Sequence, residues 1–246
     1  MIHRSAIVAV LGEDARVYLR AAEEADMIEL RLDLIHKSDP LETLKAVRDA
    51  TAKPIIATVR LRTEGGMYQG SEDERIDLLI KASCYADYVD VELLAEKRDE
   101  AMSRIKKPLI VSYHDFQNML DETRLAEVYG QMKSTKAAIA KIALTPQNLL
   151  DNLRILQFLL DADMPLCMIA MGRIGRHLRA VAPLYGSALT YGFVAESTAP
   201  GQMSLKDLII ARKLLDDDIA TASQPPTTTQ SSNSLSYLGI ERIVRE

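Results

Sequence analysis

Residues Pro108–Leu144 read PLIVSYHDFQNMLDETRLAEVYGQMKSTKAAIAKIAL. Two short apolar runs, Pro108–His114 and Ala137–Leu144, are rich in strand-forming residues. The stretch between them, Glu122–Ser134, has the spacing of an amphipathic helix. A strand, a helix and a second strand in this order predict two parallel strands joined by a crossover helix.

The same alternation runs through most of the chain. Further strands are predicted at Ala6–Leu11, Met27–Ile35, Pro54–Arg60, Tyr88–Leu93, Pro165–Met171 and Ala188–Val194. Further helices are predicted at Glu13–Ala25, Pro40–Ala50, Glu72–Ala86, Leu94–Ile105, Gln147–Ala162, Gly175–Tyr185 and Leu205–Asp218. This number of strand–helix units favours an α/β protein with a (β/α)8 TIM barrel over a doubly wound open sheet, which has the same local pattern. The absence of a glycine-rich dinucleotide motif after the first strand also favours the barrel.

The character of the sequence changes after Asp218. Residues 221–234, TASQPPTTTQSSNS, are a low-complexity stretch that cannot bury a core, and residues 235–246 regain some apolar side chains. We therefore expect residues 1–220 to form a single barrel domain. Residues 221–246 are expected to be a flexible linker followed by a short C-terminal segment.

Composition excludes several classes of protein. The formal net charge is −5 and no basic stripe is present, which argues against a nucleic-acid partner. Cys84 and Cys167 are the only cysteines and have no metal-ligand or CxxC neighbours, so a reducing cytoplasm is expected. The pattern of a signal peptide is missing, and no apolar run is long enough to span a bilayer, so we expect no membrane partner.

In a parallel barrel, functional side chains project from the carboxyl ends of the strands. Several of the predicted strands carry charged residues near this end: Glu29, Arg31, Asp33, Arg60, Asp90 and Glu92. Because side chains two apart on a strand share a face, these groups are predicted to point into the barrel. For any single member of the set, an internal layer of structural ion pairs is the alternative.

Lys141 is the only charge within the apolar run Ala137–Leu144. Burial and cationic neighbours lower the pKa of a lysine, which frees its amine to attack a ketone or an aldehyde. His114, at the end of the neighbouring fifth strand, is placed to carry a proton, and Glu92 on the fourth strand to orient the imidazole. The alternative is a structural lysine paired with an interior carboxylate such as Glu29.

Two further features follow the seventh and eighth strands. Arg179 can bind a carboxylate with its planar fork, although a solvated helix arginine is the alternative. The segment STAPGQ, residues 197–202, contains a Pro–Gly turn and could form a lid over a substrate. The remaining histidines, His3, His36 and His177, are predicted to be surface or loop residues.

Seven motifs occur in the chain in a specific order: ELRLD, ATVR with EGG shortly after it, VDVEL, SYHDF, KIAL followed by Pro146, YGSALTYG and APGQ. In this order and spacing, from about Ala6 to Leu215, the sequence resembles the type I 3-dehydroquinate dehydratases of the shikimate pathway. The resemblance implies a (β/α)8 barrel without metal or organic cofactor. It also implies syn elimination of water from 3-dehydroquinate, giving 3-dehydroshikimate through a lysine imine, in a protein that is often a homodimer.

The resemblance also implies a role for each residue that matches a motif. Lys141 attacks the C3 ketone, His114 takes the C2 proton and protonates the departing C1 hydroxyl, and Glu92 orients His114. Arg179 aligns with an arginine that binds the substrate carboxylate. The substrate hydroxyls and the pocket walls are matched by Glu29, Arg31, Arg60, Thr198 and Gln202. The chain departs from the family at Ala9, Leu178 and Thr198, where serine is common, which affects fine substrate contacts and not the lysine and histidine chemistry.

Two other functions fit parts of this pattern. A class I aldolase-like barrel also uses a Schiff-base lysine, but it usually needs a glycine-rich phosphate loop after the eighth strand, and APGQ stands there instead. A barrel that only binds a small carboxylic acid is the non-enzymatic alternative. It leaves a desolvated lysine beside an imidazole without a purpose.

Overall fold

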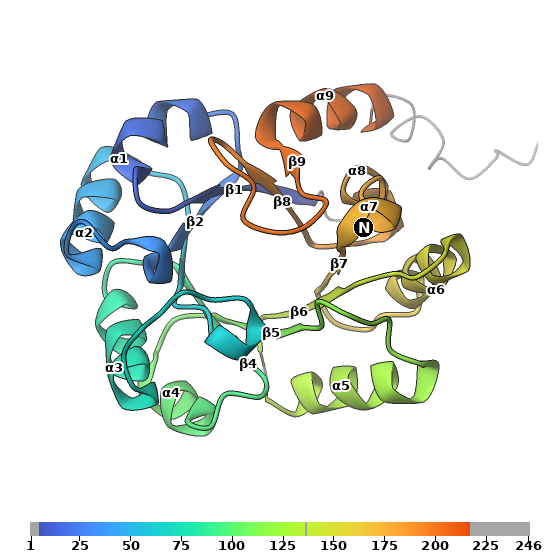
Figure 1. The fold of residues 1–246 in the computed structure, drawn as a ribbon, viewed down its shortest axis with the longest axis horizontal. Coiled ribbons are helices and arrows are strands. Elements are labelled where there is room, and N and C mark those ends of the chain that lie inside the picture. Colours follow the sequence, from blue (N-terminus) through green and yellow to red (C-terminus); the bar gives the residue numbers. More distant parts are fainter. Residues whose placement is uncertain (1–4, 136, 217–246) are drawn as a thin grey trace, which may run out of the picture.

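The computed structural model describes residues 5–135 and 137–216, and its centre is a ring of parallel strands enclosed by helices (Figure 1). The strands are β1 Ala6–Leu11, β2 Met27–Arg31, β3 Ile55–Thr58, β4 Tyr88–Glu92, β5 Leu109–His114, β6 Ile139–Leu144, β7 Leu166–Ala170 and β8 Leu189–Phe193. Parallel ladders run from β7 through β1 to β8. The two ends of this series also meet: the backbone N–H of Ala188, just before β8, donates to the carbonyl oxygen of Leu166 on β7 at 2.8 Å, which closes the ring. The predicted (β/α)8 barrel is thereby confirmed.

Helices cover the outside of the ring, as Figure 1 shows. The α-helices are α1 Ala15–Tyr18, α2 Pro40–Ala50, α3 Glu72–Ala82, α4 Arg98–Arg104, α5 Glu122–Ser134, α6 Leu149–Leu160, α7 Gly172–Gly175, α8 Leu178–Val181 and α9 Leu205–Asp216. Short 3-10 turns are η1 Leu19–Ala22, η2 Leu32–Leu34, η3 Arg62–Glu64 and η4 Ala182–Tyr185, and β9 Met203–Ser204 pairs with β8.

Local signals explain where several helices begin. Ser71 and Glu74 form a reciprocal capping box at the start of α3, and Asp39 accepts backbone N–H groups ahead of α2. The helix predicted after β7 is instead divided into α7, α8 and η4. Gly175 at the end of α7 lies so close to β7 that a Cβ atom there would stand 2.5 Å from the Ala170 Cβ.

The strands bury two separate apolar layers. One lies between the strands and the helices and includes Ile28 and Leu30, which alternate with the inward-facing charged residues of β2. The other fills the barrel interior and includes Val8, Ile56 and Ile110. Each buried side chain of this size contributes about 1.5–3 kcal/mol. Because this apolar layer fills part of the interior, the charged side chains are left to the carboxyl end of the strands.

The register of the strands decides which side chains of the barrel interior lie at the same height. Glu92 on β4 is opposite Ser112 on β5, and Ser112 is opposite Lys141 on β6. His114 lies two residues further along β5 and is opposite Ala143. The imidazole therefore lies one layer above Glu92 and Lys141, nearer the carboxyl end of the barrel.

The structure does not describe the predicted C-terminal tail, and it allows a test for membrane-spanning helices only in the rest of the chain. Residues 221–246, which the sequence predicts to be a linker and a short C-terminal segment, lie outside the described residues. Within residues 5–135 and 137–216, the helices are too short or too polar for any of them to cross a membrane.

Candidate active site

A buried pocket opens at the carboxyl end of the strands and gathers most of the side chains that the sequence singles out. It is lined by Glu29, Arg31, Arg60, His114, Lys141, Arg179, Thr198 and Gln202, together with Glu64, Phe116, Met171, Tyr191 and several small or apolar residues. Eight of the nine predicted site residues thus share one cavity. Glu92 is the ninth and does not line it.

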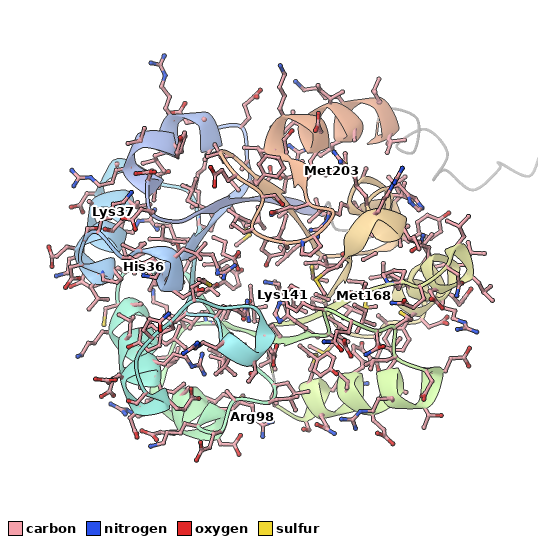
Figure 2. All side chains as sticks on the ribbon, viewed as in Figure 1. His36, Lys37, Arg98, Lys141, Met168 and Met203 are labelled. Carbon is pink, nitrogen blue, oxygen red and sulfur yellow. The ribbon has the colours of Figure 1, made fainter. Side chains whose placement is uncertain are left out.

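Lys141 projects from β6 into the middle of the barrel, near the centre of the ring in Figure 2. The residue is 4% exposed, and its Nζ donates to Asp90 Oδ2 at 3.0 Å and to Glu29 Oε1 at 3.4 Å. Nζ also lies 4.3 Å from the centroid of the Tyr191 ring, at the distance of a cation–π contact. The pairing with Glu29 that the structural alternative requires is therefore present, yet the amine still faces the pocket.

Asp90 links Lys141 to a second buried cation. Its carboxylate accepts both terminal nitrogens of Arg60 at 2.9 Å and the Ser112 hydroxyl. Burial raises the pKa of Asp90, but the charges of Arg60 and Lys141 lower it more, so this carboxyl stays ionised. Asp90 thus provides a fixed negative charge beneath the amine.

His114 is held by Glu64 and not, as the sequence predicts, by Glu92. The imidazole Nδ1 lies 2.8 Å from Glu64 Oε2, and the same oxygen accepts the His114 backbone N–H at 3.0 Å. Glu92 lies one layer lower, where its oxygens accept Arg60, the Leu61 N–H and Arg75. The prediction that Glu92 orients His114 is wrong, because the strand register places Glu92 level with Ser112.

Both members of the His114–Glu64 pair are buried and favour their neutral forms. Burial raises the pKa of Glu64 to about 8, the nearby Arg60 charge opposing this only in part. Burial also lowers the pKa of His114 well below its usual value, and the charges of Arg60 and Lys141 lower it further. The two groups share a hydrogen bond, so they exchange protons as a pair.

Sequence reasoning missed Glu64 because this residue lies in a short 3-10 turn beyond β3, not on a strand. The EGG motif was the available signal. Gly65 has φ +81°, and a Cβ atom there would stand 2.5 Å from the Phe116 ring. A Cβ atom at Gly66 would stand 1.8 Å from the Arg60 carbonyl oxygen. Two glycines are therefore needed to turn the chain tightly after Glu64.

Arg179 brings a charge without a carboxylate to the other side of the pocket. The residue is 4% exposed, and its only side-chain hydrogen bond among the described residues is a long one of 3.4 Å from an NH2 nitrogen to the Pro200 oxygen. Its Nε is also buried, and no described residue accepts a hydrogen bond from it. Burial lowers the pKa of Arg179 to about 10. A buried guanidinium of this kind is costly unless an anion joins it.

The remaining predicted residues surround this centre. Arg31 forms a two-pronged pair with Asp33, at 2.8 and 2.7 Å. Gln202 Oε1 accepts the backbone N–H and the hydroxyl of Thr198, which ties the two ends of the segment after β8 together. Threonine at position 198 thus keeps a hydroxyl at the pocket, while Leu178 is buried in the apolar layer between strands and helices.

Comparisons with known proteins agree with the geometry. The family described as type I 3-dehydroquinase matches residues 7–218. A 3-dehydroquinate dehydratase of Methanothrix thermoacetophila is 48% identical over 216 residues, which is 87% of this chain and 93% of the relative. One from Methanococcoides burtonii is 37% identical and covers 87% and 95%.

Solved structures give the same result. The crystal structure of 3-dehydroquinate dehydratase from Geobacillus kaustophilus has a TM-score of 0.78 and 29% sequence identity, covering 87% of this chain and 91% of that one. The type I enzyme from Clostridium difficile has a TM-score of 0.77 and 28% identity, covering 87% and 94%. With a family match across nearly the whole barrel, the chain belongs to the type I 3-dehydroquinase family.

Proposed function

We propose that the protein is a 3-dehydroquinate dehydratase that eliminates water from 3-dehydroquinate through a Schiff base on Lys141. One observation carries the proposal: a single buried pocket holds the Lys141 amine, the His114–Glu64 pair and the Arg179 guanidinium, for which the described residues provide no carboxylate. The names of the relatives support this substrate. The C. difficile relative was solved with covalently modified comenic acid, which suits a site that forms covalent bonds.

The first half of the reaction builds an electron sink. The uncharged Lys141 amine attacks the C3 ketone of the substrate, and loss of water from the carbinolamine leaves an iminium ion. Glu29 Oε1, 3.4 Å from Nζ, is placed to accept the proton that the amine must first release and to return it to the carbinolamine hydroxyl that leaves as water, while Asp90, 3.0 Å from Nζ, stays ionised. Their negative charges, with the face of Tyr191, then stabilise the iminium cation.

The second half of the reaction moves one proton from carbon to oxygen. His114 takes the C2 proton, and the C2–H electrons move into the iminium to give an enamine. The C1–O bond then breaks as the protonated His114 returns the proton to the leaving hydroxyl, which departs as water. Glu64 holds Nδ1 throughout, so that Nε2 faces the substrate. Hydrolysis of the conjugated iminium releases 3-dehydroshikimate and restores Lys141.

The substrate's other groups meet the pocket walls. Arg179 binds the carboxylate in this proposal, because it is the buried cation in the pocket for which the described residues provide no carboxylate. Hydroxyl groups of the substrate are assigned to a set on the remaining walls: Glu29, Arg31, Arg60, Thr198 and Gln202. Direct assay tests the function, since the product is a conjugated enone whose ultraviolet absorbance appears on turnover. A purified protein that leaves 3-dehydroquinate unchanged contradicts the proposal.

Replacing Arg179 with methionine is expected to raise KM by about 10–100-fold and to change kcat less. A hydrogen bond to a charged group contributes about 1.5–3 kcal/mol, and each 1.4 kcal/mol is tenfold in affinity. The melting temperature should not fall, because the variant also removes a buried charge that meets no carboxylate in the described part of the chain. Steady-state kinetics measure the effect, with the exposed Arg176→Met as the control. An unchanged KM contradicts the assigned role.

The pH profile should report the His114–Glu64 pair. Proton abstraction needs Nε2 free while Nδ1 donates to an ionised Glu64, and this form appears as pH rises through the Glu64 pKa of about 8. We therefore expect kcat/KM to rise from pH 6 through pH 8, where it reaches about half of its maximum, and to level about one pH unit higher. In Glu64→Gln the rising part of the kcat/KM profile (its acidic limb) should move to lower pH, because the pKa of His114 itself lies well below 6.5. Identical profiles for both proteins would exclude the coupling.

Assembly, location and boundaries complete the proposal. We place the catalytic unit in residues 1–220, and we propose a cytoplasmic homodimer without metal or organic cofactor. The resemblance to the family supports the dimer, and so does an exposed row of leucines on α6: Leu149, Leu150, Leu153 and Leu160. A molar mass measured by light scattering at the value of one chain would contradict the dimer.

A further inference from the structure

The loop that carries Glu64 is fastened at both ends to one carboxylate. This loop, Arg60–Met67, follows β3 and makes a tight turn between Leu61 and Gly66, which brings Glu64 and Gly65 to the pocket. Asp33 Oδ1 accepts the backbone N–H of Arg60 at 3.2 Å, and Asp33 Oδ2 accepts that of Met67 at 3.1 Å. The two oxygens of a single side chain thus close the loop.

Asp33 is itself held rigidly. It is 1% exposed, and Arg31 donates to both of its oxygens at 2.8 and 2.7 Å. Burial raises the pKa of Asp33, but the hydrogen bonds and charge of Arg31 and the two loop N–H groups lower it below its usual value. An ionised carboxylate has enough lone pairs to accept all of these bonds at once, and an amide in its place does not.

Glu92 provides a second attachment near the start of the loop. Its Oε1 accepts the Leu61 N–H at 2.9 Å, and its Oε2 accepts Arg75 at 2.8 Å. Arg75 is 2% exposed and also donates to the Val59 carbonyl oxygen at 2.8 Å. The loop therefore has two carboxylate attachments, and each carboxylate is fixed by its own buried arginine.

The hydrogen bonds within the loop hold only its turn. Its turn contains Gly65 and Gly66, and the hydrogen bonds inside it are the backbone bonds that Glu64, Gly65 and Gly66 make to Leu61 and Arg62. Neither Asp33 nor Glu92 lines the substrate pocket. Their contacts with the loop are therefore explained by positioning and not by substrate binding.

We propose that Asp33 and Glu92 are positioning residues that clamp the Arg60–Met67 loop and so keep Glu64 against Nδ1 of His114. The proposal rests on the proposed function, in which His114 transfers the proton. It gives Glu92 a role different from direct contact with the imidazole. A displacement of about 1 Å at a catalytic group can reduce the rate by about 100-fold, so a loose loop is enough to impair proton transfer.

Asp33→Asn tests the clamp, because an amide nitrogen in place of either oxygen leaves one end of the loop, the Arg60 N–H or the Met67 N–H, without its acceptor. We expect kcat to fall by about 10–100-fold, while borohydride still traps the imine on Lys141 to the wild-type extent. The pH limb of kcat/KM should move to lower pH, as in Glu64→Gln. Asp87→Asn is the control. Asp87 also accepts hydrogen bonds from an arginine and from a backbone N–H, those of Arg48 and Ile55, but it lies at the amino ends of the strands, away from the pocket. The control variant should leave kcat unchanged.

Two results would overturn the proposal. One is an Asp33→Asn variant with wild-type kcat and pH limb. The other is a rise in KM alone, because that outcome follows if the substitution only disturbs Arg31 in the pocket wall. If the variant does not fold, amide hydrogen exchange in the wild-type protein decides. The clamp predicts slow exchange at Met67 although its side chain is half exposed, and fast exchange contradicts it.

The clamp and the enzyme activity can fail separately. If the wild-type protein does not turn over 3-dehydroquinate, the proposed function fails. The clamp is then judged by nitrogen NMR of the His114 ring. The chemical shift of Nδ1 should show that its hydrogen bond to Glu64 is lost in Asp33→Asn and kept in Asp87→Asn. An unchanged Nδ1 signal in Asp33→Asn contradicts the clamp whether or not the protein is active.

Discussion

Lys141→Arg should lose at least about 10⁴-fold in kcat, because removal of a catalytic nucleophile costs of that order or more. A guanidinium stays charged and does not form an imine with a ketone. It can still pair with Asp90 and Glu29 and lie over the Tyr191 ring, so the ionic surroundings are largely kept. The loss should therefore appear in turnover and not in the circular dichroism spectrum. Turnover within tenfold of the wild type would show that no imine is needed.

A neutral variant separates charge from chemistry. Lys141→Met removes the cation that joins Asp90 and Glu29, although Asp90 keeps its two hydrogen bonds to Arg60. We expect the same loss of turnover as in Lys141→Arg, together with a lower melting temperature, since a buried carboxylate that loses a partner is destabilising. If only the methionine variant were inactive, the role of Lys141 would be electrostatic.

His114→Ala should reduce kcat by about 10²–10⁴-fold, the usual effect of losing a general acid–base group. The imine chemistry resides on Lys141, so borohydride should still label this variant when substrate is present. That combination, slow turnover with intact trapping, assigns His114 to the proton-transfer steps. Rapid-quench experiments can measure the rate of imine formation separately from the rate of product release in this variant.

His36→Ala is the control for this variant. His36 is exposed beyond β2, and Figure 2 places it at the periphery of the ring, away from Lys141. Its kcat should equal that of the wild-type protein. Equal turnover by His114→Ala would remove the imidazole from the mechanism, and failure of His114→Ala to be labelled would mean that the imidazole is also needed to form the imine.

The barrel was predictable because its pattern is local. Alternation within each strand separates Ile28 and Leu30 from Glu29 and Arg31, and the structure buries the two sets in different layers. Short strands followed by amphipathic stretches then specify the crossover helices. The pocket lining was largely predictable for the same reason, since parallel strands deliver their carboxyl ends to one place.

The partner of His114 was not predictable from strands alone. Glu92 is on the strand next to β5, but its height relative to His114 depends on the stagger between strands, which one sequence does not reveal. Glu64 reaches the imidazole from a glycine-rich turn, so its position depends on a backbone path set by Gly65, Gly66 and the contacts of Asp33. Loop geometry of this kind comes from long-range contacts and not from periodicity.

The environment of Lys141 shows the same limit. Its burial follows from the apolar run around it, but its two carboxylate partners come from β2 and β4. Their presence makes the resting side chain part of an ion-pair network as well as a nucleophile. Arg179 differs, because a buried cation without a carboxylate among the described residues could be recognised only once the fold was known.

The most direct test of the Schiff-base mechanism is borohydride reduction during turnover. The protein is mixed with 3-dehydroquinate and borohydride, digested, and its peptides are sequenced by mass spectrometry, with Lys141→Arg treated in parallel. One stable adduct is expected on Lys141; it needs both substrate and borohydride and is absent from Lys141→Arg. An active wild-type protein that gives no adduct, or gives it on another residue, would contradict the account.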